Sequence, residues 1–203
     1  MIRYHAIALI EFKSIAVGVQ AGDAMVKKAP IAMLKAGTVH RGKYLVLIGG
    51  SVASVEESFR EGLHVGGETV IDKVLLPDVH EQVLDAIMGY RQKIEAESLG
   101  VLETSTVAAT IAAADAAIKG ATVNIIRIRL ADGLGGRAFT MVAGKVEDVE
   151  AAIEIGSKAV ADRDIELYQT VIPALHDNMA QEIEASTRFH ATVRLDLPGE
   201  EES

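Results

Sequence analysis

Two stretches of this chain decide its fold: EFKSIAVGVQAGDAMVKKA at residues 11–29 and ETSTVAATIAAADAAIKGA at residues 103–121. Both begin with a glutamate, continue through a hydroxyl residue and contain an Asp-Ala-x-x-Lys pattern, at a constant spacing of 92 residues (103 − 11). The shared order continues with Gly-x-Val at residues 50–52 and 144–146, and with Pro-x-x-His at residues 77–80 and 173–176. Composition alone does not preserve such an order, so the sequence indicates a tandem duplication of one domain.

The duplication divides the 203 residues into two domains of roughly 90 residues, each large enough to bury a modest core. We assign the first domain to residues 1–94 and the second to residues 95–186. A period this long excludes a solenoid, whose repeats run to about 20–50 residues. Residues 187–203 have no counterpart in the first half. Within them, the apolar–polar alternation of residues 188–197 predicts an extra strand, and residues 198–203 form an acidic tail that we expect to be disordered.

Hydrophobic patterning predicts the same order of elements in each half. Ser14 and Thr106 precede alanine-rich segments and are expected to cap them as helices. Strands are predicted at residues 5–11, 31–35, 44–48, 70–76, 123–130, 138–142 and 166–172, and helices at residues 15–29, 52–65, 81–92, 107–121, 146–161 and 177–185. Together with a strand that ends at Glu103, the counterpart of the one that ends at Glu11, each half therefore reads β-α-β-β-α-β. This is the ferredoxin-like arrangement of the α+β class.

Composition excludes several classes of protein. The chain has no cysteine, which rules out disulfides, thiolate metal sites and a cysteine nucleophile, and which fits a reducing cytoplasm. A formal net charge of −9 argues against nucleic acid as a partner. We find neither a signal peptide nor an apolar run of about 20 residues, so we expect no membrane association. With 49% hydrophobic residues, the two halves are expected to pack together or to associate with other chains.

Two symmetric pairs of titratable residues are candidates for chemistry. Glu11 and Glu103 lie at strand ends, where a carboxylate either performs acid–base work or accepts bonds from backbone donors, and we favour the second interpretation. His80 and His176 each close a Pro-x-x-His segment, and we favour capping or packing between subunits over a role as ligand or base. A duplicated enzyme would rarely keep both copies of its site.

The loops at residues 37–42 and 131–136 occupy the same place in the two halves, yet they are the least alike part of the repeat. Glycine allows the backbone of such a loop to approach a ligand or a symmetry axis closely. His40 and Arg41 make the first loop basic. A functional loop and a plain solvated turn both remain open on these residues alone.

The repeated pattern resembles the bacterial microcompartment (BMC) shell domain, and the resemblance covers nearly all of residues 5–185. Two copies in unpermuted order resemble the tandem-domain shell proteins, in particular the propanediol-utilisation type that carries an iron–sulfur cluster at its pore. The resemblance implies a homotrimer whose six domains form a pseudohexamer. Such pseudohexamers tile, with other shell proteins, into a compartment in the bacterial cytoplasm that encloses enzymes.

The resemblance also assigns roles to residues. Lys27 and Lys119 match the family's edge lysine, and His80 and His176 lie near the same tile edge. The two loops match the pore loops. The residues implied to ring the threefold axis are Thr38, Val39, His40, Arg41 and Gly42 from the first half, and Leu134, Gly135 and Gly136 from the second.

The chain departs from the family pattern at two places. His40 stands where the cluster-carrying relatives have a cysteine, so an iron–sulfur cluster cannot form in the same way and we expect no cofactor. Three symmetry-related His40 side chains are an alternative metal site, for zinc for example, but we favour a cationic or polar pore for small metabolites. Many single-domain relatives have arginine directly after the proline, where this chain has Asp78 and Ala174.

The sequence therefore predicts a structural shell protein that is not an enzyme. The alternative is a trimeric protein that binds a metal or metabolite, as a sensor or an electron conduit. A small isomerase on the same fold ranks third, because the sequence offers only symmetric pairs rather than one catalytic set. Ferredoxin-like domains host many functions, so the fold by itself does not decide between them.

Overall fold

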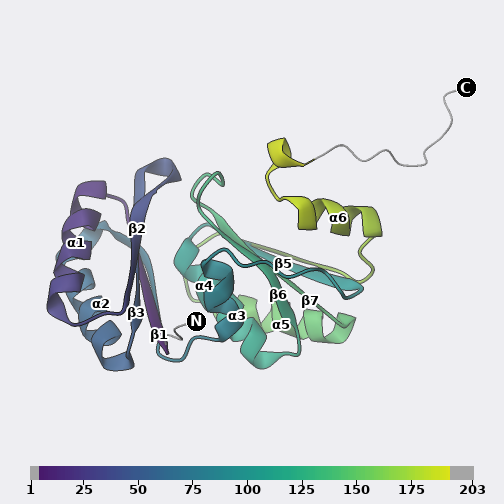
Figure 1. Cartoon of the computed structure of the whole chain (residues 1–203), viewed down its shortest axis with the longest axis horizontal. Helices are drawn as coiled ribbons and strands as arrows, with labels where there is room; N and C mark the ends of the chain where they lie inside the picture. Colours follow the sequence, from purple (N-terminus) through teal and green to yellow (C-terminus); the bar gives the residue numbers. More distant parts are fainter. Residues whose placement is uncertain (1–4, 193–203) are drawn as a thin grey trace, which may run out of the picture.

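The computed structural model describes residues 5–192 and contains two halves with one topology (Figure 1). The first half consists of β1 (Ala6–Phe12), α1 (Ile15–Lys28), β2 (Met33–Val39), β3 (Lys43–Gly50), α2 (Val52–Gly66), β4 (Val70–Leu76) and α3 (Glu81–Ile87). The second consists of β5 (Ser98–Thr104), α4 (Val107–Gly120), β6 (Asn124–Leu130), β7 (Ala138–Gly144), α5 (Val146–Lys158), β8 (Leu167–Ile172) and α6 (Asp177–Ala185). The predicted pair of βαββαβ domains is confirmed.

Both sheets are antiparallel, and their strand orders are β2-β3-β1-β4 and β6-β7-β5-β8. The predicted caps are also present: Ser14 Oγ accepts the Val17 N–H at 3.3 Å, and Thr106 Oγ1 accepts the Ala109 N–H at 3.4 Å. A side-chain cap satisfies one of the free N–H groups of the first helical turn. The caps therefore explain why both helices begin where the sequence places them.

Three predicted elements have a boundary that is wrong by more than two residues. The strand predicted at residues 31–35 is β2, which starts at Met33 and continues through Val39, so part of the predicted loop is paired backbone. The helix predicted at residues 81–92 is α3 and ends at Ile87, since the chain turns at Gly89 with a φ of 100°. The helix predicted at residues 146–161 is α5 and ends at Lys158, because Ala159 and Val160 bond locally.

The extra strand predicted at residues 188–197 is wrong where the structure describes it. Phe189–Ala191 is a 3₁₀ turn, and the Thr192 N–H donates to the Phe189 carbonyl. A strand needs a sheet edge that takes up its backbone groups, whereas this segment satisfies them locally. The remainder of the predicted strand, residues 193–197, and the predicted tail at residues 198–203 lie outside the described residues.

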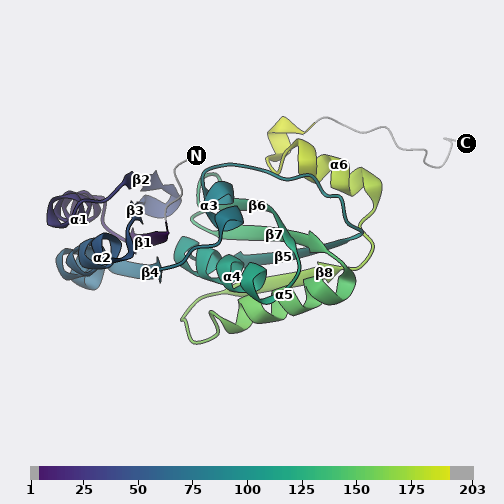
Figure 2. The ribbon, with the colours of Figure 1, turned by 60° about the horizontal axis from the view of Figure 1, so that its bottom comes forward.

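The two halves share a hydrophobic core. One face of the first sheet packs against α1 and α2, in a cluster that includes Ile10, Val46 and Phe59. The opposite face carries Leu9 and Leu47, which belong to one buried cluster with α3, α4 and the second sheet. The second half thus covers the open face of the first sheet, and both views show the halves side by side (Figures 1 and 2).

On the second sheet, α4 and α5 lie on one side and α6 on the other (Figures 1 and 2). Ile183 of α6 packs with Leu99 and Ala143, at the end of β5 farther from Glu103. The Glu103 end of that sheet face is therefore not covered by α6. Within residues 5–192, no helix has the length and apolar character needed to cross a membrane.

Candidate functional site

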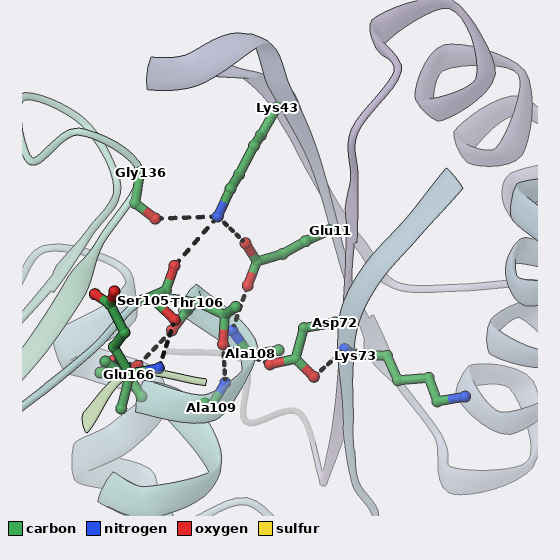
Figure 3. Close-up of polar contacts among 12 residues, drawn as sticks. Glu11, Lys43, Asp72, Lys73, Ser105, Thr106, Ala108, Ala109, Gly136 and Glu166 are labelled. Atoms are coloured by element: carbon green, nitrogen blue, oxygen red, sulfur yellow. Dashed lines mark hydrogen bonds and ion pairs between the residues drawn. The ribbon is translucent and has the colours of Figure 1, made fainter. Parts of the chain in front are cut away.

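The junction between the halves is built around Glu11 and Lys43 (Figure 3). Lys43 Nζ lies 3.4 Å from Glu11 Oε2 and donates to the carbonyls of Ser105 at 3.2 Å and Gly136 at 3.3 Å. Glu11 Oε1 accepts the Ala108 N–H at 2.7 Å. The Glu11 carboxylate of the first half therefore caps the N-terminus of α4 in the second, where the helix dipole favours negative charge.

Burial sets the protonation of this carboxyl. The Glu11 side chain is 0% exposed, and desolvation raises its pKa from 4.5 to about 7, against the opposing effects of the Ala108 N–H and the Lys43 ammonium. The carboxyl is thus poised near neutrality by its place in the fold. Backbone bonding, rather than catalysis, was the favoured interpretation of this glutamate, and the Ala108 contact agrees with it.

Glu103, the counterpart of Glu11, has different surroundings. Its Oε1 lies 3.2 Å from Arg137 Nη1, and its side chain is 40% exposed. Arg137 also pairs with Glu166 and lies over the Tyr168 ring, 5.4 Å from its centroid. Within one chain, Glu103 therefore caps no helix: the sequence symmetry of the two glutamates is broken because only one of them faces another domain.

The two loops predicted to form the pore lie side by side. The Gly133 N–H donates to His40 Nδ1 at 3.0 Å, and Lys43 holds the Gly136 carbonyl. Arg41 adopts a positive φ of 65°, which is uncommon for a residue with a side chain. The structure thus brings the loop of each half to one place on the surface, as a shared axis requires.

The predicted pore residues differ in their local structure. Thr38 and Val39 belong to β2, where they pair with Tyr44 and Lys43. The residues exposed in the chain are Thr38, His40, Arg41 and Gly42, those half-buried are Val39, Leu134 and Gly135, and Gly136 is buried. The basic first loop is therefore more open to solvent than the glycine-rich second loop. Whether these residues ring a threefold axis stays a prediction.

His80 and His176 cap the two short helices. His80 Nδ1 accepts the Gln82 N–H at the start of α3, and His176 Nδ1 accepts the Asn178 N–H at the start of α6, both at 3.2 Å. These are the capping roles given above as the favoured interpretation of the pair.

The edge lysines sit in related but unequal networks. Each pairs with the aspartate four residues before it, Lys27 with Asp23 at 2.6 Å and Lys119 with Asp115 at 2.7 Å. Only Lys119 has further partners across the junction. It donates to the Asp78 carbonyl, and Asp115 Oδ1 accepts the His80 N–H at 2.8 Å.

A corresponding asymmetry separates the helices α1 and α4. The apolar residues Val107, Ile111 and Ile118 of α4 are at most 8% exposed, and they belong to the core shared with the first half. Their counterparts in α1, at the same spacing of 92 residues (107 − 15), are Ile15, Val19 and Val26, which are 43–52% exposed. Helix α1 thus presents to solvent the face that α4 buries against a neighbouring sheet.

The described residues of one chain do not bring together the ligands of a metal centre. Among residues 5–192, no three His, Asp or Glu side chains lie close enough to hold an ion, and the sequence has no cysteine for a cluster. His40 Nδ1 accepts a backbone N–H, so the proton of its neutral ring sits on Nε2. Metal-ligating histidines instead donate their second ring N–H. The chain thus has no cysteine thiolates to hold an iron–sulfur cluster. The hydrogen bond from the Gly133 N–H to His40 Nδ1 leaves the ring proton on Nε2, so zinc binding through this ring would require the bond to break.

Sequence reasoning missed two features of this region. One is Lys43, which the sequence shows only as the last residue of a basic loop. The other is a group of arginines, of which Arg127 and Arg129 alternate along β6. Two basic residues on one face of an otherwise apolar strand were the available signal for the second feature.

Comparisons with known proteins agree with this architecture. A family model described as the BMC domain matches the chain twice, at residues 6–79 and 98–175. The bacterial microcompartment shell protein PduT of Citrobacter freundii is 38% identical over 174 residues, covering 86% of this chain and 95% of that protein.

Solved structures give the same result. The crystal structure of a microcompartments protein from Desulfitobacterium hafniense is 39% identical, with a TM-score of 0.76 over 87% of this chain and 98% of the other. A fused permuted hexameric shell protein, at 22% identity and a TM-score of 0.56 over 77% of this chain and 84% of the other, shares the fold. The chain belongs to the BMC domain family, of which it carries two consecutive copies.

Proposed function

We propose that this chain is a structural shell protein of a bacterial microcompartment and that three copies of it form one pseudohexameric tile. The observation that carries the proposal is the exposed apolar face of α1. In α4 the corresponding face is buried against the open face of the first sheet. The surface that would receive α1 is the Glu103 end of the second sheet in a neighbouring chain, which corresponds to the face of the first sheet that receives α4. If α1 of each chain packs on the second sheet of the next chain, as α4 packs on the first sheet within a chain, three chains close into a ring.

The polar groups of α1 support the same contact. Within a chain, the Glu11 carboxylate accepts the Ala108 N–H. The repeat, at its spacing of 92 residues, makes Glu103 the counterpart of Glu11 and Ala16 the counterpart of Ala108. In a ring, Glu103 of one chain would therefore accept the Ala16 N–H of the next chain. Asp23, whose side chain is 59% exposed, would receive the His176 N–H as Asp115 receives that of His80. Each chain thus carries both partners of a second contact like the one it already makes internally, and these partners can meet only between chains.

The pore of this ring would be lined by both loops. Three copies of His40, Arg41 and Gly42 would alternate with three copies of Leu134, Gly135 and Gly136. The exposed Arg41 gives the constriction a positive character, and the exposed His40 makes it polar. Such a ring favours small anionic or polar metabolites over cations. The hydrogen bond that occupies His40 Nδ1 supports a pore without metal, and the symmetric pairs of residues support a protein without catalysis.

At the tile edge, Lys27 and Lys119 would pack their aliphatic stems against the next tile while their ammonium groups remain hydrated. Other shell proteins, and the enzymes that the shell encloses, are the expected partners. The compartment itself would lie in the cytoplasm.

Light scattering coupled to gel filtration tests the ring. We expect a trimer for the wild-type chain and a folded monomer for Val19→Glu, because the substitution places a charge in the α1 contact. The control is Val52→Glu, which adds the same charge to the exposed first turn of α2. A trimer unaffected by Val19→Glu, or a wild-type monomer at assembly concentrations, would contradict the proposal.

A further inference from the structure

Four arginines line one cleft of the second half. Residues that end and follow α6 also line this cleft, and Figure 2 shows α6 on the side of the second sheet opposite α4 and α5. Arg127 and Arg129 come from β6, Arg91 from the segment that joins the halves, and Arg188 from the turn after α6. The cleft has a volume of about 460 Å³ and is also lined by Thr187 and His190. We call these four residues and the space between them the arginine cleft.

The arginine cleft contains an unmatched donor. Arg127 is 4% exposed, its Nη1 donates to Thr187 Oγ1 at 3.0 Å, and its buried Nε has no hydrogen-bond partner. Arg129 Nη1 donates to the same Thr187 oxygen at 2.9 Å. Two guanidinium groups thus share one neutral hydroxyl, and a buried N–H of a charged group is destabilising when it has no partner. The arrangement favours an additional acceptor.

Among the residues that the structure describes, the arginine cleft has no paired counter-charge. Within residues 5–192, none of its four guanidinium groups forms an ion pair with a carboxylate. Glu184 Oε1 instead accepts the Ile94 N–H at 2.7 Å. Arg129 Nη2 donates to the backbone carbonyl of Asp132 at 2.8 Å, but the Asp132 carboxylate lies beyond ion-pair distance. Burial first, and then the positive charges of Arg91 and Arg129, lower the pKa of Arg127.

This positive cluster belongs to the second half alone. Strand register identifies the counterparts of the two β6 arginines in the first half. Arg127 pairs with Met141 as Lys35 pairs with Leu47. Arg129 pairs with Phe139 as Gly37 pairs with Leu45. The first half thus has one exposed lysine and a glycine where the second has two arginines. In a protein with a net charge of −9, such a local excess of positive charge needs a reason.

We propose that the arginine cleft binds a small molecule that carries a phosphate group. Guanidinium groups match phosphate oxygens in a bidentate manner, and several oxygens of one phosphate can accept from several arginines at once. An adjoining hollow shares Arg129, Thr187 and Arg188 with the cleft and reaches His40 and Leu134 of the pore loops. The site therefore lies next to the pore loops, where it would collect a phosphorylated metabolite. It is built from one chain, so binding does not require the proposed trimer.

Isothermal titration with pyrophosphate at low ionic strength tests this proposal on the full chain. We expect saturable binding, about tenfold or more weaker in Arg127→Met and in Arg129→Met, because each loses a charge-assisted bond. Arg188→Ala should also bind pyrophosphate more weakly. Because Arg188 is exposed, this variant should fold normally and can test the site even if a β6 variant does not fold. The matched control is Lys35→Met, at the equivalent place of the first sheet, which should bind as the wild type does.

Three results would overturn the proposal. The first is no pyrophosphate binding by the wild-type chain. The second is equal binding by wild type, Arg127→Met and Arg188→Ala. The third is binding that emerges only when Asp196, Glu200, Glu201 and Glu202 are changed to amides, which would assign the cleft to the chain's own acidic end. Succinate titrated in parallel should bind more weakly, and equal or tighter binding of this dicarboxylate would refute phosphate as the preferred group.

Discussion

Glu11 and Glu103 illustrate what a residue type decides and what its surroundings decide. The two glutamates hold the same place in the repeat, and both lie on the first strand of their sheets. Glu11 is buried against the start of α4 and has a raised pKa, whereas Glu103 pairs with Arg137 in partial contact with solvent. The carboxyl chemistry follows from the residue, but its protonation follows from the domain placed against it.

The raised pKa of Glu11 predicts a pH dependence of stability. Below about pH 4.5 the carboxyl is protonated in both the folded and the unfolded chain. Between pH 4.5 and about 7 the unfolded chain releases the proton first, so the free energy of unfolding falls as the pH rises. Above that window the loss is about 3 kcal/mol.

Glu11→Gln removes this titration while keeping an acceptor for the Ala108 N–H. Denaturant unfolding at pH 5 and pH 8 should show the wild type losing stability relative to the variant by up to about 3 kcal/mol. Parallel changes in the two proteins would show that Glu11 titrates normally.

His40 carries the second prediction at this scale. Because its Nδ1 already accepts the Gly133 N–H, we expect purified protein without a histidine tag to contain no stoichiometric metal. Elemental analysis measures this directly. About one zinc ion per three chains, lost in His40→Ala, would instead establish a three-histidine site.

At the scale of elements, the repeat explains why two halves of different composition form the same layers. The helix–sheet contact in the second half is close because Gly100 of β5 has no side chain. A Cβ at this position would lie 2.8 Å from Ile153 Cγ1 and 2.8 Å from Val149 Cγ1, both on α5. The glycine therefore sets how closely α5 approaches the sheet.

Gly100→Ala should consequently destabilise the protein by about 1–3 kcal/mol through overpacking. Gly37→Ala is the matched control, since a Cβ at Gly37 meets no atom within 4 Å and that strand position has no positive φ. Thermal unfolding of both variants measures the difference. If the two variants melt together, the close packing at Gly100 does not limit stability.

At the scale of the whole molecule, one chain contains one complete junction between its two domains. It also carries both surfaces of a second such junction, and these surfaces do not meet within the chain. The internal junction is formed by α4, Glu11 and Lys43, and the unmatched surfaces are formed by α1 and the Glu103 end of the second sheet. In the proposed homotrimer, two domains related in this way close a tile by combining with further copies of the chain.

The edge of that tile carries the final prediction. Lys27→Ala should weaken the formation of sheets or tubes seen by electron microscopy while leaving the trimer intact. Lys119→Ala should weaken assembly too, but it also removes the bond to the Asp78 carbonyl, so Lys27 is the cleaner test. Lys158→Ala is the control, because its side chain matches that of Lys27 at 73% exposure and in an i,i+4 ion pair. Assembly that survives Lys27→Ala and Lys119→Ala unchanged would contradict the assigned edge.

The sequence by itself determined the duplication, the order of elements, the helix caps and the positions of the two loops. These follow from short-range patterns: hydrophobic periodicity, capping residues and glycine. The sequence pattern was wrong for residues 188–192. An alternating apolar–polar pattern predicts a strand, but it does not specify a partner strand with which the segment could form backbone hydrogen bonds. Only the tertiary structure decided which glutamate is buried, that the two loops meet, and that Arg127 and Arg129 share one hydroxyl with no carboxylate beside them among the described residues. Those properties depend on which surface faces which domain, and burial changes the energy of a charge far more than its neighbours along the chain do.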